Sequence, residues 1–216
     1  MDRSQGETLN FIEEYLQDTK MLIDLLPIGD IQHFVEAVCA AYDEDRQVFV
    51  VGNGGSAATA SHMACDLGKT VLQSLSEVNQ KRLKVLSLTD NVSLITAWAN
   101  DVSYDLVFAE QLRTFARPGD LLIVISGSGK SPSVVEVVQA AREMGLTTVG
   151  LLGFDGGRVR TLVDRYIIVG SDHYGHVEDL HLLLNHLLTA YLRRALVGHR
   201  DGASRGQPVA VGAARG

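Results

Sequence analysis

Five short apolar runs recur along this chain of 216 residues, and each is followed by a segment in which apolar residues repeat at helical intervals. A strand, a helix and a second, parallel strand form the βαβ unit, and repetition of this unit builds a mostly parallel sheet with helices on both faces. In such sheets ligands bind beyond the carboxyl ends of the strands. The expected strands are Val48–Val51, Val85–Leu88, Leu121–Ser126, Thr148–Leu152 and Tyr166–Val169.

Helices are expected at both ends of this alternation. Apolar residues repeat at helical spacing from Thr8 to Asp45, with an interruption near Pro27, which predicts two helices before the first strand. Their apolar stripe needs a cover, which a second subunit would provide. The segment Val177–Leu196 predicts a long final helix, and the Gly-, Ala- and Arg-rich residues 199–216 predict a mobile tail.

The size and charge of the chain narrow the classes of function. Its length suits one substantial core, so we expect a single domain. The formal net charge of −7 gives no electrostatic reason to bind nucleic acid or an anionic membrane. No run approaches about twenty apolar residues, and the N-terminus lacks the apolar stretch of a signal peptide. Cys39 and Cys65 form no CxxC pair, which favours the cytoplasm.

Two glycine-serine loops follow expected strands, and both suit a phosphate group. The first, GNGGS at 52–56, has Ala57 where a dinucleotide fingerprint has its third glycine, and it lacks the Lys-Ser/Thr of a Walker A loop. The second, SGSGKS at 126–131, precedes a helix expected to begin near Pro132. Backbone N–H groups, serine hydroxyls and a helix N-terminus donate hydrogen bonds to a phosphate, with Lys130 as a candidate added charge. The alternative is a turn that only caps a helix, and the presence of two such loops favours phosphate binding.

Two helical segments each contain a pair of residues suited to metal binding or proton transfer. His62 and Asp66 lie four positions apart, and Glu178 and His186 lie eight apart, so each pair falls on one face of its helix. Two imidazoles and two carboxylates suit zinc, which binds nitrogen and oxygen ligands tetrahedrally. They equally suit metal-free proton transfer. His181, in the same helix as His186, is expected to support the site or a subunit interface.

The loops GNGGS and SGSGKS, together with the segment HLLLNH at 181–186, resemble the sugar isomerase (SIS) domain family. The phosphoheptose isomerase branch is the most similar, and the resemblance covers the chain to about Leu196. It implies a three-layer, flavodoxin-like α/β sandwich with a central mostly parallel five-stranded sheet and extra N-terminal helices, formed by residues 1–198 as one SIS domain. It also implies a homotetramer with active sites at subunit interfaces.

The resemblance implies a role for each motif. The loop serines would hold the phosphate of a small sugar phosphate, while Asn53 and the Asn-Asp pair at 100–101 would touch sugar hydroxyls. The implied substrate-binding residues are Asn53, Gly54, Ser56, Asn100, Asp101, Ser126, Gly127, Ser128 and Ser131. A zinc ion would be held by His62, Asp66, Glu178 and His186. Asp66 and His186 would form the catalytic acid–base pair, with Glu178 as the alternative base.

Two positions depart from this branch, in which a glutamate stands at the place of Asp66 and a glutamine at the place of Glu178. The shorter aspartate draws its carboxylate back by roughly 1.5 Å, whereas catalytic placement tolerates about 0.5 Å. Glu178 makes the site more anionic, which favours a bound metal. The expected function is isomerisation of sedoheptulose 7-phosphate to D-glycero-D-manno-heptose 7-phosphate through an enediolate. The alternatives are a non-catalytic SIS protein that binds a sugar phosphate or a protein partner, and another isomerase or a lyase of the same fold.

Overall fold

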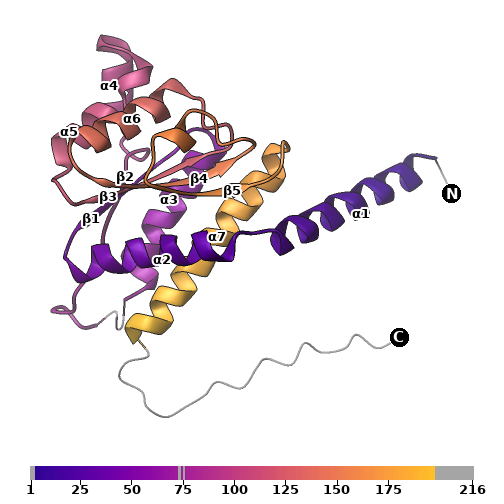
Figure 1. Ribbon diagram of the computed structural model, residues 1–216, viewed down its shortest axis with the longest axis horizontal. Helices are drawn as coiled ribbons and strands as arrows, with labels where there is room; N and C mark the ends of the chain where they lie inside the picture. The colour runs from indigo at the N-terminus through magenta and orange to yellow at the C-terminus, as the bar shows by residue number, and fades with distance from the viewer. Residues whose placement is uncertain (1–2, 73, 75, 198–216) are drawn as a thin grey trace.

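The middle layer of the protein is a sheet of five parallel strands, seen in the computed structural model that describes residues 3–72, 74 and 76–197 (Figure 1). The strands are β1 (Gln47–Val51), β2 (Lys84–Ser87), β3 (Leu121–Ser126), β4 (Thr147–Gly153) and β5 (Arg165–Val169). Each lies within one residue of its expected run at either end, and all pairings are parallel, so the predicted sheet is confirmed. The expected mobile tail at 199–216 lies outside the described residues.

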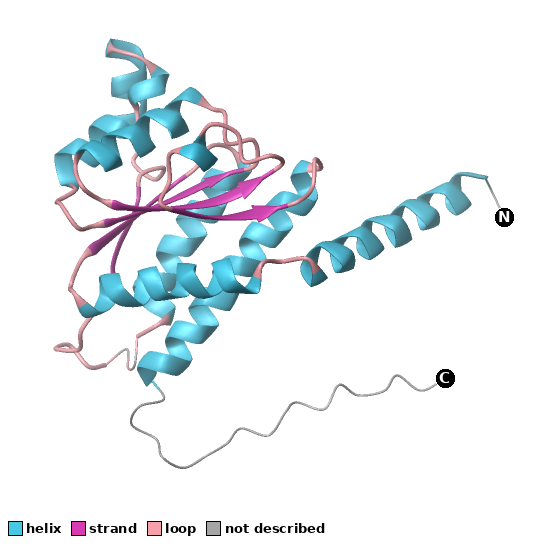
Figure 2. Cartoon of the chain, in the orientation of Figure 1, coloured by secondary structure: helices cyan, strands magenta, loops and turns pink. Residues whose placement is uncertain are grey.

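Helices lie on both sides of the sheet and give the three predicted layers (Figure 2). One side has α2 (Ile28–Asp43), α3 (Gly55–Cys65) and α7 (Tyr174–Val197), and the other has α4 (Val92–Asp101), α5 (Ala109–Phe115) and α6 (Pro132–Glu143). Shorter turns are η1 (Asp66–Thr70), η2 (Tyr104–Leu106) and η3 (Val159–Thr161). In the described part of the chain, no helix combines the length and apolar character needed to cross a bilayer.

The strand residues explain why the sheet is buried on both faces. In β1, Val48 and Val50 pack into one apolar core with α2, α3 and α7, while Phe49 and Val51 pack into the other with α5 and α6. Successive side chains of a strand point to opposite faces, so one continuous apolar run fills two cores. The carboxyl ends of the strands are thereby held by close packing, and the loops that follow them start from a rigid scaffold.

The strand order β2-β1-β3-β4-β5 places β1 between β2 and β3. The connection from β1 leads to β2 at one edge of the sheet, whereas the connections from β3 lead to β4 and β5 toward the other edge. The boundary between β1 and β3 is therefore a topological switch point. β1 and β3 pair from Val48↔Leu121 to Val51↔Val124. The loops that follow these two strands, GNGGS and SGSGKS, consequently open into the same crevice.

The first helix, α1 (Arg3–Asp24), extends away from the three layers (Figure 1). It contacts α7 through Tyr15, whose ring stacks on His176 with centroids 4.1 Å apart and whose hydroxyl donates to Asp179 at 2.7 Å. The expected pair of N-terminal helices is confirmed. Their apolar stripe is largely uncovered in a single chain, because the exposed large side chains include Leu9, Phe11, Ile12, Leu16, Met21, Ile23, Leu25 and Ile28.

Candidate active site

A small pocket lies between the loops that follow β1 and β3. Its volume is about 270 Å³, and the start of α7 forms one wall. The lining residues are Asn53, Gly54, Gly55, Ser56, Ser126, Gly127, Ser128, Ser131, Tyr174 and Glu178. Each loop residue expected to bind substrate is therefore brought to one place, at the switch point of the sheet. We call it the loop pocket.

The loop pocket presents hydrogen-bond donors to a bound anion. α3 begins at Gly55 and α6 at Pro132, so two helix N-termini meet at the loops, where backbone N–H groups favour negative charge. The hydroxyls of Ser126 and Ser128 accept hydrogen bonds from the N–H groups of Gly129 (3.0 Å) and Lys130 (3.3 Å). A hydroxyl that accepts a hydrogen bond still has its own proton to donate, so both serines are free to donate to a phosphate oxygen.

The loop pocket offers dipoles rather than cations. Among the described residues that line it there is no lysine or arginine. Lys130, the candidate added charge, is exposed and pairs with Asp155 at 3.3 Å. The Glu178 carboxylate lies so close to Gly55 that any side chain at that position would overlap with it. A phosphate in this pocket would therefore have one negative side chain as a neighbour.

Asn53 is held at both ends of its side chain. Its Nδ2 donates to Ser133 Oγ at 2.9 Å, and its Oδ1 accepts from the Tyr104 hydroxyl at 2.9 Å. These bonds fix the shape of the first loop, and they leave the second N–H of Nδ2 and the second lone pair of Oδ1 free for a sugar hydroxyl. Tyr104, Ser133 and Tyr174 are residues of the site that sequence reasoning missed, since no motif or periodicity marks them.

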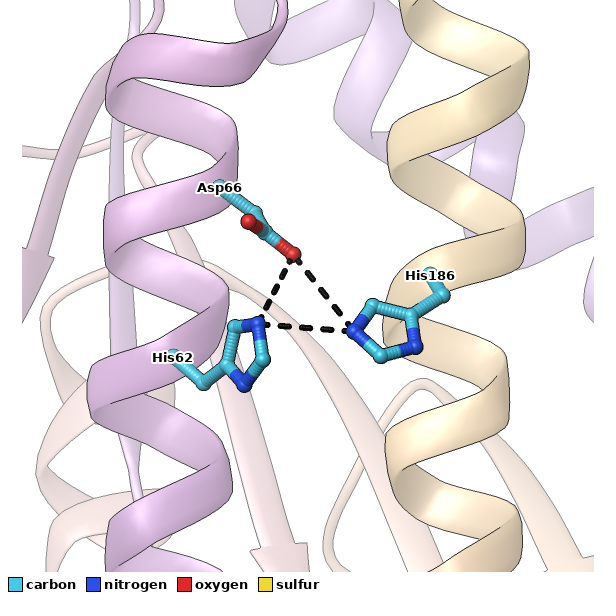
Figure 3. A group of neighbouring side chains, drawn as sticks. All are labelled: His62, Asp66 and His186. Carbon is cyan, nitrogen blue, oxygen red and sulfur yellow. Dashed lines mark hydrogen bonds and ion pairs between the residues drawn. The ribbon is translucent and has the colours of Figure 1, made fainter.

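Three of the four expected metal ligands converge between α3 and α7 (Figure 3). His62 Nε2 lies 3.3 Å from Asp66 Oδ2 and 3.4 Å from His186 Nε2, and His186 Nε2 lies 4.0 Å from Asp66 Oδ2. Bonds of about 2.0–2.1 Å to a tetrahedral zinc ion place its ligand atoms about 3.3 Å apart. The His-Asp-His trio formed by these residues therefore fits three corners of a zinc site.

The trio lies at the surface of the single chain. The side chains of His62 and His186 are 44% and 54% exposed, while that of Asp66 is 16% exposed. The trio borders a cavity of about 620 Å³, whose lining comprises Asp66, Thr70, His186, Thr189, Ala190, Arg193 and Arg194. Three protein ligands with one open position are typical of catalytic rather than structural zinc sites, because substrate or water can take the fourth place.

Glu178 is not part of the trio within one chain. It lies eight residues before His186 in α7, a separation of about 12 Å along the helix axis, and it lines the loop pocket instead. The two residues share a face of the helix, as their spacing predicts, yet they reach different sites. The assignment of Glu178 as a metal ligand stays a prediction.

Asn100 and Asp101 end α4, on the opposite side of the sheet from α3 and α7 (Figure 1). Asn100 Nδ2 donates to Asp101 Oδ1 at 2.7 Å, and both residues are exposed. Neither is among the residues that line the loop pocket or the cavity beside the trio. Their contact with a sugar stays a prediction, and one chain alone does not bring them to the other site residues.

His181 lies on α7 between Glu178 and His186 and is only 1% exposed. Burial lowers the pKa of its imidazole from 6.5 to about 4, and the backbone of Leu152 opposes this shift. The unfolded chain therefore takes up a proton near pH 6.5, while the folded chain takes it up only near pH 4. Acid consequently favours the unfolded state across this window.

Acid is expected to destabilise the protein through His181. The stability that comes from keeping this imidazole neutral is complete above pH 6.5 and is lost toward pH 4, by about 2 kcal/mol at pH 5. His181→Leu should reduce the drop in unfolding free energy between pH 7 and pH 5 by a similar amount, measured by urea denaturation. The exposed His33 provides the control, since His33→Asn should keep the wild-type pH dependence. A wild-type pH dependence in His181→Leu would contradict the assignment.

Comparisons with known proteins agree with the fold. Residues 14–153 match the SIS domain family. A phosphoheptose isomerase from Clostridium acetobutylicum is 35% identical over 196 residues, which cover 88% of this chain and 97% of the relative. One from Paramagnetospirillum magneticum is 39% identical over 157 residues, covering 73% and 79%. The solved structure of the phosphoheptose isomerase from Neisseria gonorrhoeae has a TM-score of 0.77 at 28% identity and covers 87% of this chain and 97% of that one. The resemblance seen in the motifs is confirmed, and the chain belongs to the SIS domain family and, within it, to the phosphoheptose isomerases.

Proposed function

We propose that the protein is an aldose–ketose isomerase that converts sedoheptulose 7-phosphate to D-glycero-D-manno-heptose 7-phosphate. The observation that carries the proposal is the His-Asp-His trio, whose ligand atoms lie within 4.8 Å of one another. The loop pocket suits the phosphate end of such a substrate, and the names of the relatives support a heptose phosphate as its class. The free thiols of Cys39 and Cys65 fit an enzyme of the cytoplasm.

The isomerisation moves a proton between the two carbons that exchange the carbonyl group. It needs a base at one carbon, an acid at the carbonyl oxygen, and stabilisation of the enediolate. In the proposed mechanism Asp66 removes the proton from one carbon and returns it to the neighbouring carbon. His186 donates a proton to the carbonyl oxygen and takes up the proton of the neighbouring hydroxyl as the new carbonyl group forms. Asp66 Oδ2 and His186 Nε2 lie 4.0 Å apart, which lets them address adjacent atoms of one substrate.

The trio also fits a zinc ion, held by His62, Asp66 and His186. A bound zinc ion would polarise the substrate oxygens and stabilise the developing negative charge. In this zinc-bound form of the mechanism Asp66 is engaged as a ligand, and Glu178 takes its place as the base. The proton transfers and the direction of the reaction are otherwise the same.

The proposed assembly is a homotetramer in which active sites form between subunits. Glu178 and the trio lie about 12 Å apart along α7, so the two parts of the site are separate in one chain. The uncovered apolar side chains of α1 support a partner of the same kind, because an exposed apolar stripe of this length is typical of an interface. Glu178 of one copy would then lie beside the trio of another copy and act there as the base.

Turnover by the purified protein tests the function. Incubation with sedoheptulose 7-phosphate, followed by proton NMR, should show the aldose appear, and removal of metal with a chelator should slow the reaction until zinc is restored. Full activity in protein that contains no metal would refute the zinc assignment alone. Binding of the sugar phosphate without turnover would instead favour the non-catalytic alternative. Isomerisation of a different sugar phosphate would change the assigned substrate but not the assigned reaction type.

A further inference from the structure

Among the buried polar side chains of α7, three lie at intervals of four residues: His181, Asn185 and Thr189. They run beside the apolar stripe of the same helix, which packs into the core with Leu180, Leu184, Leu188 and Leu192. Asn185 is 0% exposed. An amide buried to this degree lowers stability unless its hydrogen bonds are satisfied, so the partner of Asn185 decides what the residue does.

The partner of Asn185 is the aspartate of the trio. Asn185 Nδ2 lies 3.0 Å from Asp66 Oδ2, across 119 positions of sequence. A carboxylate only accepts hydrogen bonds, so the amide nitrogen is the group that faces it. This is the same oxygen that lies 3.3 Å from His62 Nε2 and 4.0 Å from His186 Nε2. Asn185 therefore holds the one carboxylate oxygen on which the trio converges.

Stability does not explain an asparagine at this position. Its Oδ1 is buried and has no hydrogen-bond partner among the described groups. A leucine has the same branched shape and would not bury an unpaired carbonyl, which costs about 1–3 kcal/mol. The contact with Asp66 is what the asparagine supplies and the leucine does not.

Asp66 needs a hydrogen bond that fixes its carboxylate, because its side chain is short and its backbone conformation is irregular. It begins the π-helical turn η1, in which the helix widens, and such turns are frequent at functional sites. The second oxygen of Asp66 accepts a long hydrogen bond from Thr70, at 3.5 Å. Asn185 reaches across from the facing helix and makes the shorter contact.

We propose that Asn185 is a positioning residue, which holds Asp66 Oδ2 where His62 and His186 meet and thereby sets the metal affinity and the turnover of the trio. This inference rests on the proposed function of the same site. It also accounts for the placement of the short aspartate side chain, because the hydrogen bond from α7 fixes its carboxylate. Hydrogen bonds to metal ligands of this kind change metal affinity or activity by about 10–100-fold.

The test compares Asn185→Leu with wild type and with Leu184→Ala. Zinc affinity, measured by competition with a chromophoric chelator, should weaken by about 10–100-fold in Asn185→Leu, while its thermal midpoint stays near that of wild type and kcat falls more than KM changes. Leu184→Ala removes a fully buried neighbour whose side chain has no group that could form a hydrogen bond with Asp66. It should lower the thermal midpoint and leave the zinc affinity of the folded protein unchanged.

Crystal structures of metal-free wild type and Asn185→Leu give a readout that needs neither zinc nor turnover. The Asp66 carboxylate should leave the trio in the variant. Wild-type protein that binds no zinc and shows no turnover would sink the proposed function, and the two structures would still decide the role of Asn185. An Asp66 carboxylate that keeps its place in Asn185→Leu overturns the positioning role, as does wild-type zinc affinity in that variant.

Discussion

Turnover is expected to return when two inactive variants, Asp66→Ala and Glu178→Ala, are co-expressed and purified as mixed assemblies through two different tags. Each variant alone should lose about 10²–10⁴-fold in kcat, the usual contribution of a positioned acid or base. In a mixed assembly, some sites take the trio from the Glu178→Ala chain and the glutamate from the Asp66→Ala chain. Random mixing makes about a quarter of the sites intact, so turnover should approach a quarter of the wild-type value.

The control for this experiment is a mixture of Asp66→Ala with His186→Ala. Both residues belong to the trio of one chain, where their side chains lie 4.0 Å apart, so no arrangement of the two variants rebuilds an intact trio. Native mass spectrometry would establish that mixed assemblies form in both cases. Absence of activity in the first mixture would show that Glu178 acts within its own chain or takes no part, and activity in the control would contradict a trio supplied by one chain.

The strands and the two loops are predictable because local chemistry determines them. The run LLIVI before SGSGKS fills both cores at once, which requires a buried strand. Gly54 and Gly129 adopt φ values of +57° and +61°, a region that favours glycine. Because each signal lies within a few residues of the feature that it produces, the loop pocket and its place in the sheet follow from the sequence pattern alone.

The contacts that complete the site are not predictable in this way. Tyr104 reaches Asn53 across 51 positions, and Asn185 reaches Asp66 across 119. No periodicity links such residues, because their meeting depends on how helices are placed on the sheet. The position of Glu178 is unpredictable for the same reason. Its spacing from His186 shows that the two residues share a face of α7, but the point at which α3 crosses α7 decides that His186, and not Glu178, meets His62 and Asp66.

Gly129→Ala is expected to lose both stability and sugar-phosphate binding. A side chain at Gly129 would overlap with the carbonyl of Gly156 and would lie 3.1 Å from the nitrogen of Gly157, and the backbone there has a φ of +61°. The SGSGKS loop is also joined to the start of η3 by a hydrogen bond from Val159 N to the Gly129 carbonyl, at 3.1 Å. Strain and overlap together should lower the unfolding free energy by about 2–5 kcal/mol. The KM for the sugar phosphate should rise, because Gly129 N also positions the Ser126 hydroxyl.

Gly145→Ala separates these two causes. Gly145 has a φ of +75°, and the nearest atom to an added side chain is Pro118 Cβ, at 3.9 Å. This variant has the backbone strain without the overlap and lies outside the loop pocket, so it should lose only about 1 kcal/mol and keep its KM. Equal losses of unfolding free energy in both variants would mean that backbone strain alone makes Gly129 necessary. A side chain at Gly129 would overlap with Gly156 and displace the serine hydroxyls of the loop. A wild-type KM in Gly129→Ala would therefore mean that phosphate binding does not depend on the shape of SGSGKS.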